Sequence, residues 1–102
     1  MQKFLYEILV PTNVNNHNPA RLRHHRRWDD YVRKLSGGLT ILRPATGQWV
    51  HQDKLFVERV IPVRIYCTED DIKKIIKFTL GHYQQIAVMA YKISSEVYIE
   101  YA

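Results

Sequence analysis

The chain has little of what disulfide-stapled, low-complexity or membrane-spanning proteins depend on. Its 102 residues include one cysteine, four glycines and four prolines. The lone Cys67 cannot close an internal disulfide, which excludes a secreted, disulfide-stapled scaffold, and the composition is typical of one globular domain. No apolar run approaches the roughly 20 residues that cross a bilayer, and Met1 to Phe4 lacks the apolar stretch of a signal peptide. We therefore expect one cytoplasmic domain with no membrane contact.

The charge of the chain lies in its first half. Residues 1 to 51 hold eight basic and three acidic side chains, whereas residues 52 to 102 hold seven of each, so the first half carries the whole net charge of +5. Within it, residues 21 to 34 contain six basic and two acidic side chains. This segment either attracts phosphate or another anion, or it is a solvated helix face that Asp29 and Asp30 partly neutralise.

The first half predicts a strand, a loop, a helix and a short strand. Lys3 to Val10 is apolar on both of its alternating faces, which is typical of a central strand. The Asn-rich loop after it predicts a helix with Asn18 as its cap and Pro19 at its first position. Apolar residues at helical spacing then continue to a stop at Gly37, and residues 39 to 42 are typical of a short strand.

The second half predicts a long strand, a helix and a last strand. After a turn over residues 43 to 48, the long strand spans about 54 to 66, antiparallel to the short one, with a bulge or an unpartnered side at Pro62. Thr68 is a strong helix cap because three acidic residues follow it. An apolar stripe at helical spacing leads to Tyr83, and residues 86 to 101 are expected as one long strand.

The order of elements predicts the fold. Strand, helix, strand, strand, helix, strand with right-handed crossovers gives a ferredoxin-like βαββαβ domain of class α+β, in which two helices cover one face of a four-stranded antiparallel sheet. The first and last strands are apolar on both faces, so the other face needs a cover. We expect a homodimer that buries Leu5, Leu9 and Met89, or their neighbours of opposite parity, between two sheets. A ligand or a partner protein on that face is the alternative.

Short motifs in residues 35 to 93 carry a resemblance. They are Gly37-Gly38-Leu39-Thr40, then Gly47-Gln48-Trp49, an extended strand, a helix, and a final strand at Gln84-Gln85-Ile86-Ala87-Val88. In this order they resemble uncharacterised small bacterial and phage proteins of ferredoxin-like fold. The chain departs from them at Arg23-His24-His25-Arg26-Arg27, which is more basic. The resemblance implies the fold and adds no catalytic residue.

Five histidines and the cysteine are the candidates for metal or nucleophile chemistry. No two histidines have a familiar ligand spacing, and the adjacent His24 and His25 point about 100° apart on a helix. His82, near the end of its helix, is expected to interact with terminal carbonyls. Cys67 precedes a helix whose N-terminus would favour the thiolate, or it is a buried packing residue. We predict no metal site and no cofactor.

A first candidate site is a small-ligand pocket or enzyme active site lined by His51, Glu58 and Arg64. A carboxyl beside an imidazole or a guanidinium can move protons, and Glu7 with an Arg or a His is a variant of the same arrangement. Because Glu58 and Arg59 are adjacent on a strand, they lie on opposite faces.

A second candidate site is a surface for nucleic acid or nucleotide on the first helix. Its basic side chains would contact phosphates while Trp28, Tyr31 or Trp49 stacks on bases. The arginines concerned are Arg21, Arg23, Arg26 and Arg27. Three functions therefore stay open: a dimeric ferredoxin-like binding or regulatory module, a nucleic-acid or nucleotide binder, and a small α+β-barrel enzyme.

Overall fold

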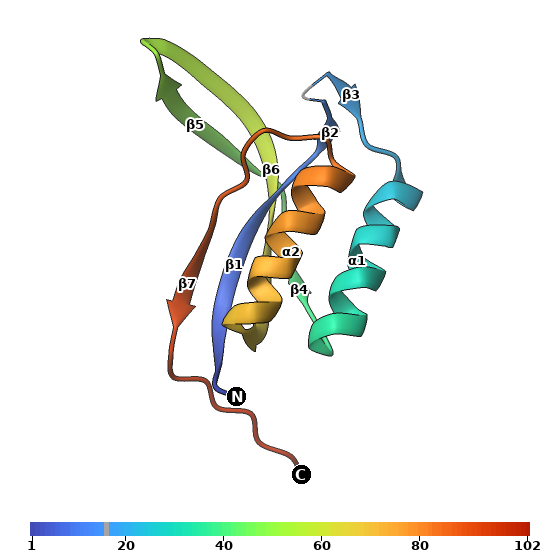
Figure 1. The fold of residues 1–102 in the computed structure, drawn as a ribbon, viewed down its shortest axis with the longest axis vertical. Coiled ribbons are helices and arrows are strands. Elements are labelled where there is room, and N and C mark those ends of the chain that lie inside the picture. Colours follow the sequence, from blue (N-terminus) through green and yellow to red (C-terminus); the bar gives the residue numbers. More distant parts are fainter. Residues whose placement is uncertain (16) are drawn as a thin grey trace.

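The domain is built around β1 (Lys3–Pro11), which lies between β6 (Lys54–Thr68) and β7 (Ala90–Ser94) and runs antiparallel to both (Figure 1). The structure is a computed structural model that describes residues 1–15 and 17–102. Strands that are apolar on both faces favour the interior of a sheet, and the central position predicted for this segment is correct.

The remaining strands are short or peripheral. β4 (Thr40–Ile41) and β5 (Ala45–His51) both pair with β6, so the main sheet has five strands in the order β4-β6-β1-β7, with β5 on the same edge as β4. β2 (Asn13–Val14) and β3 (Asn18–Pro19) form a separate ribbon. The main sheet has five strands where four were predicted. The turn expected over residues 43 to 48 is wrong beyond Pro44, because residues 45 to 51 form β5 by pairing with β6.

Two helices cover one face of this sheet and run in opposite directions, α1 (Leu22–Ser36) and α2 (Glu69–His82) (Figure 1). This is the predicted ferredoxin-like α+β fold. The uncovered side is called the helix-free face below. In the part of the chain that the structure describes, no helix is both long and apolar enough to span a bilayer.

The core lies between the helices and the sheet. Alternate residues of β1 and β6 point into it, and Trp28 is only 1% exposed. Its indole Nε1–H donates a 2.8 Å hydrogen bond to the hydroxyl of Thr79 on α2. The buried apolar residues are Tyr6, Ile8, Val10, Trp28, Val32, Val60, Val63, Ile65, Cys67, Ile72, Ile75 and Tyr83.

Local signals set the ends of both helices. The Thr68 hydroxyl accepts a 3.1 Å hydrogen bond from the backbone N–H of Asp71, as the capping pattern predicts. Gly37 ends α1 with φ of 90°, a left-handed conformation that glycine adopts without a steric penalty.

Pro62 lies where β6 changes partners on its outer edge. Val63 and Arg64 pair with β4, whereas residues up to Val60 pair with β5. Between them the Pro62 carbonyl accepts a hydrogen bond from Leu42 N–H, at 2.9 Å. The N–H and C=O of one residue in an antiparallel strand point to the same side. The side on which Pro62 lacks an N–H therefore faces the gap between β4 and β5, and no bulge is needed.

Two expected boundaries are wrong. Asn18 and Pro19 belong to β3, and α1 begins at Leu22 after Arg21, whose side chain makes no capping bond. The β2–β3 ribbon forms here in place of the expected helix start, because Asn13 pairs with Pro19 and Ala20 N–H donates to Thr12 O at 2.9 Å. The expected strand over residues 86 to 101 is reduced to Ala90–Ser94, because β1 pairs with this segment only from Leu5 to Ile8 and the register shifts between Leu5 and Tyr6.

Candidate functional site

The β5–β6 hairpin extends beyond the helices (Figure 1). A groove lies at its base. The groove has a volume of about 690 Å³. One wall is the hairpin, and the other is the segment that leaves β1 and turns toward α1. A 3.1 Å hydrogen bond from the Thr12 hydroxyl to the Arg59 carbonyl joins the two walls. We call it the hairpin groove; its lining residues are Pro11, Thr12, Asn13, Asn15, His17, Thr46, Trp49, Phe56, Val57, Glu58 and Arg59.

One carboxyl and two aromatic rings dominate the chemistry of the hairpin groove. Trp49 and Phe56 are cross-strand partners whose rings stack with centroids 6.0 Å apart. Glu58 follows Phe56 on the same side of β6 and is paired with Gly47, where the absent side chain leaves space beside the Trp49 ring. Burial raises the pKa of the Glu58 carboxyl, and within the described part of the chain it forms no ion pair. The groove thus offers planar apolar surface beside one acidic group.

The centre of the helix-free face holds a second polar cluster. Glu7, Arg64 and Tyr91 are directly opposite one another on β1, β6 and β7. The Arg64 Nε–H donates to Glu7 Oε1 at 3.1 Å, and the Tyr91 hydroxyl donates to the other oxygen of the same carboxylate. Glu7 is 8% exposed although no helix covers it. Both carboxylate oxygens of Glu7 already accept hydrogen bonds, so this cluster stabilises the pairing of the three strands.

The three residues predicted for one ligand pocket lie in three places. Glu58 lines the hairpin groove. His51 is exposed at the tip of the hairpin, next to the turn in which Gln52 and Asp53 have positive φ. Arg64 pairs with Glu7 on the helix-free face. Of these three residues only Glu58 lines a pocket. The acidic residue that pairs with an arginine is Glu7, which was the predicted alternative to Glu58.

Comparison with known proteins gives a fold and no family. No family model and no curated protein matches the chain. Among solved structures, the divalent cation tolerance protein CutA1 of Thermus thermophilus matches 90% of this chain and 82% of its own, at 11% identity and a TM-score of 0.67. CutA of Xylella fastidiosa matches 97% and 88%, at 14% identity and a TM-score of 0.69. The chain has their fold.

A third solved structure of the same fold is an enzyme. A phage SAM lyase in complex with S-methyl-5′-thioadenosine matches 95% of this chain and 93% of its own, at 17% identity and a TM-score of 0.65. At this identity the likeness shows the fold alone. The resemblance to small bacterial and phage proteins carrying the Gly-Gly-Leu-Thr motif stays a prediction.

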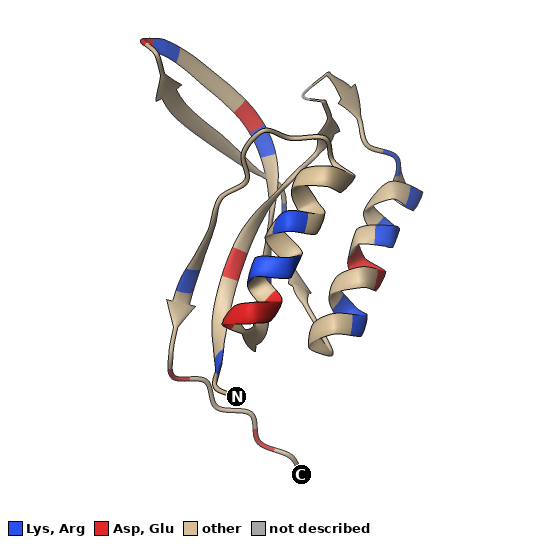
Figure 2. Cartoon of the chain, viewed as in Figure 1, with Lys and Arg blue, Asp and Glu red and all other residues tan. Residues whose placement is uncertain are grey.

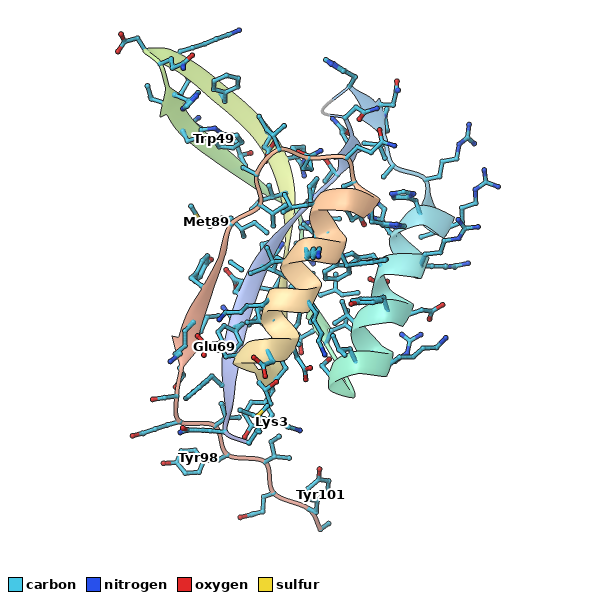
Figure 3. All side chains as sticks on the ribbon, viewed as in Figure 1. Lys3, Trp49, Glu69, Met89, Tyr98 and Tyr101 are labelled. Atoms are coloured by element: carbon cyan, nitrogen blue, oxygen red, sulfur yellow. The ribbon has the colours of Figure 1, made fainter. Side chains whose placement is uncertain are left out.

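The arginines of α1 form an exposed surface away from the groove. Arg21 precedes α1 and Arg23, Arg26 and Arg27 share one side of its first turns, three or four residues apart. Figure 2 shows these basic positions along the outer side of α1. The aromatic residues predicted to stack on bases are not beside them. Trp28 is buried, Tyr31 stacks on Phe78 of α2 with centroids 4.0 Å apart, and Trp49 lies on the hairpin (Figure 3). We call Arg21, Arg23, Arg26 and Arg27 the arginine ridge.

A column of rings joins the two helices, and sequence reasoning missed it. His24 and His82 stack with centroids 3.7 Å apart, and the Nε2–H of each donates to the backbone carbonyl of the other, at 2.7 and 2.8 Å. His25 Nδ1 shares a 2.6 Å hydrogen bond with the Tyr83 hydroxyl. Burial lowers the pKa of both His25 and His82. His82 therefore contacts the carbonyl of α1, and not the terminal carbonyls of its own helix as expected.

Cys67 is a packing residue. Its side chain is completely buried in the core. Burial, with the nearby Asp71 charge, raises the thiol pKa to about 11. Of the two alternatives for Cys67, burial supports the packing residue over the thiolate, because the cost of burying the charge exceeds the effect of the helix N-terminus.

Proposed function

We propose that the protein is a self-associating ferredoxin-like module that binds a small nucleoside in the hairpin groove. The observation that carries the proposal is the half-buried carboxyl of Glu58 beside the stacked rings of Trp49 and Phe56. Purine rings bind by stacking on aromatic side chains, and a carboxylate commonly accepts hydrogen bonds from ribose hydroxyls. The bound S-methyl-5′-thioadenosine of the phage SAM lyase, a protein of the same fold, supports this ligand class.

Self-association is the second part of the proposal, and apolar exposure supports it. Large apolar side chains are exposed on the hairpin, along β7 and after it (Figure 3). Within the described residues, the outer edges of β5 and β7 pair with no strand. Surfaces and edges of this kind favour a second chain as cover, and a second copy is the partner always present. The side chains concerned, all outside the hairpin groove, are Val50, Leu55, Met89, Tyr91, Ile93, Tyr98, Ile99 and Tyr101.

Calorimetric titration with S-methyl-5′-thioadenosine tests the ligand. We expect the wild-type protein to bind it and Glu58→Gln to bind about tenfold more weakly, a loss of about 1.4 kcal/mol. Trp49→Ala should weaken binding similarly, because the stacking surface is removed. Glu96→Gln is the matched control, since Glu96 is exposed near the C-terminus, outside the hairpin groove. No heat from the wild type at millimolar ligand, or equal binding by Glu58→Gln, would contradict the proposal.

A second candidate function is cleavage of SAM in the same groove. It is favoured by the half-buried Glu58 carboxylate beside the stacked rings: burial raises its pKa, which makes it a stronger base for the proton that is lost when the C–S bond of SAM breaks by elimination and S-methyl-5′-thioadenosine leaves. Incubation with SAM and chromatography for S-methyl-5′-thioadenosine tests it. We expect release by the wild type and by Glu96→Gln, and a loss of at least about tenfold in Glu58→Gln. Ligand binding without any release would leave the module as a binder and exclude this activity.

A further inference from the structure

The arginine ridge is a cationic surface that the protein leaves uncompensated. Arg21, Arg23, Arg26 and Arg27 are all exposed, and none of them forms an ion pair within the described part of the chain. The next exposed acidic group along α1 is Asp30, which is already paired with Arg33. The second acidic group of α1, Asp29, is half-buried, and it lies on the side of the helix that carries His25. The ridge therefore keeps its full positive charge.

The surface is also held in place. α1 is fixed to the end of α2 by the reciprocal hydrogen bonds of His24 and His82, and by the contact of His25 with Tyr83. These contacts occupy the inner side of the same two turns whose outer side carries the ridge. A partner that binds the ridge does not have to order the helix first, which lowers the entropy cost of binding.

We propose that the arginine ridge binds the phosphate backbone of double-stranded nucleic acid without reading its sequence. Guanidinium groups match phosphate oxygens with paired N–H donors, and all four side chains of the ridge are arginines. No free ring accompanies them: Trp28 is buried and Tyr31 is stacked on Phe78. Without stacking surface, the ridge has no means to prefer an unpaired strand.

An anionic membrane fits the ridge less well. Helices that bind a bilayer surface insert an apolar face beside their basic one. The apolar face of α1 is occupied by the core through Trp28 and Val32, and Leu22 is the one large exposed apolar residue on the helix. The ridge is also on the helical layer, whereas the surfaces proposed for ligand binding and self-association are on the hairpin and along and after β7. The inference is therefore independent of the proposed function.

Fluorescence anisotropy with a labelled mixed-sequence duplex tests the inference. For four phosphate contacts, the logarithm of the association constant should fall with the logarithm of salt concentration with a slope of about −3 to −4. Arg23→Gln/Arg26→Gln/Arg27→Gln should reduce the slope to about −1 and weaken binding at least about tenfold at low salt. The matched control is Arg43→Gln/Lys54→Gln/Lys92→Gln, which removes three exposed charges from the segment between β4 and β5, from β6 and from β7 and should keep most of the binding.

Three results would overturn the inference. One is an equal loss of binding in both triple variants, which would show that binding depends on the net charge of the protein and not on the arginine ridge. Another is much tighter binding to a single strand of the same length than to the duplex. The third is binding to vesicles of anionic lipid with no binding to the duplex. Circular dichroism and light scattering of each variant exclude loss of the fold or of assembly as the cause.

Discussion

The two halves of β6 have the same secondary structure and opposite surroundings. From Val60 to Thr68 the strand pairs with β1 along its length and, on its other side, with β4 at Val63 and Arg64; its core-facing side chains are buried. From Lys54 to Arg59 it pairs with β5 alone, and most of its side chains are exposed although several are apolar. One half is completed by its own chain. The other exposes an apolar surface of the kind that marks binding and association sites, which supports the proposed ligand and the proposed second copy.

The two tryptophans give the largest difference between these regions. Trp28→Ala should lower the free energy of unfolding by about 3–5 kcal/mol, because it leaves a cavity under α2 and removes the hydrogen bond to Thr79. Trp49 is 44% exposed on the hairpin, and Trp49→Ala should cost less than about 1 kcal/mol in a single chain. Urea denaturation of both variants at low protein concentration measures this. A larger loss in Trp49→Ala would mean that the hairpin supports the core.

Two ion pairs, one largely buried and one exposed, should differ by a smaller amount in their effect on stability. Arg64→Met leaves the nearly buried Glu7 with Tyr91 as its partner and should cost about 1–2 kcal/mol, the lower end reflecting the half-exposed guanidinium. Lys73→Met removes a 4.0 Å pair with Glu69 in which both side chains are 69% exposed, and should change stability by less than about 0.5 kcal/mol. Equal effects in urea denaturation would show that the helix-free face does not shield Glu7 in a single copy.

Adjacent glycines at the end of α1 offer a matched pair. Gly37 has φ of 90°, so Gly37→Ala should destabilise the protein by about 1 kcal/mol. Gly38 has no positive φ and no atom within 4 Å of an added Cβ, so Gly38→Ala should be neutral or slightly stabilising. Thermal unfolding of the two variants distinguishes them, and a Gly37→Ala protein as stable as the wild type would contradict the left-handed cap.

The smallest expected effect is a pH dependence of the helical layer. The pKa values of His25 and His82 are lowered in the fold from an ordinary value of 6.5, chiefly by burial. Neighbouring imidazoles and Arg27 add to this, while Asp29 opposes it at His25 and the hydrogen bond to the His24 carbonyl opposes it at His82. The unfolded chain then binds more protons than the folded one, so the free energy of unfolding should fall as the pH decreases below about 6.5.

Urea midpoints at mildly alkaline and mildly acidic pH measure that dependence. His25→Gln/His82→Gln should flatten it, whatever its effect on stability at one pH, whereas His17→Gln/His51→Gln should keep it because both of these histidines are exposed. A pH dependence that is unchanged in the first variant would show that other groups cause it.

Patterns local to one element predicted the fold well. The two-sided apolar pattern of β1, the Thr68 cap and the stop at Gly37 all depend on residues next to one another, and all three are correct. Asn18 and Pro19 have the composition of a helix start but pair in a ribbon, because that pairing depends on a partner strand about five residues away. The last strand was overextended for the same reason: β1 limits its length, and its own apolar residues do not.

The sites were harder to predict, because they depend on contacts between distant residues. His24 and His82 are 58 positions apart, and nothing in their spacing indicates that they exchange hydrogen bonds. Glu7 and Arg64 are 57 apart, and only the register of β1 and β6 brings them together. Glu58 was found because a carboxylate among apolar strand residues is unusual. The sequence did not indicate that Glu58 lies at the base of the hairpin, His51 at its tip and Arg64 on the helix-free face.

The mass of the protein in solution tests most directly whether a second copy covers the exposed apolar side chains of the β5–β6 hairpin. The chain weighs 12.2 kDa, and we expect light scattering to give a multiple of this mass for the wild type. Leu55→Asp/Val50→Asp, which changes two exposed partners on the hairpin outside the groove, should reduce it to the mass of one chain. Lys73→Asp/Lys74→Asp on α2 should leave the assembly intact. A wild-type protein that stays at the mass of one chain at about 100 μM, well above the micromolar Kd of even a moderate interface, would contradict the account.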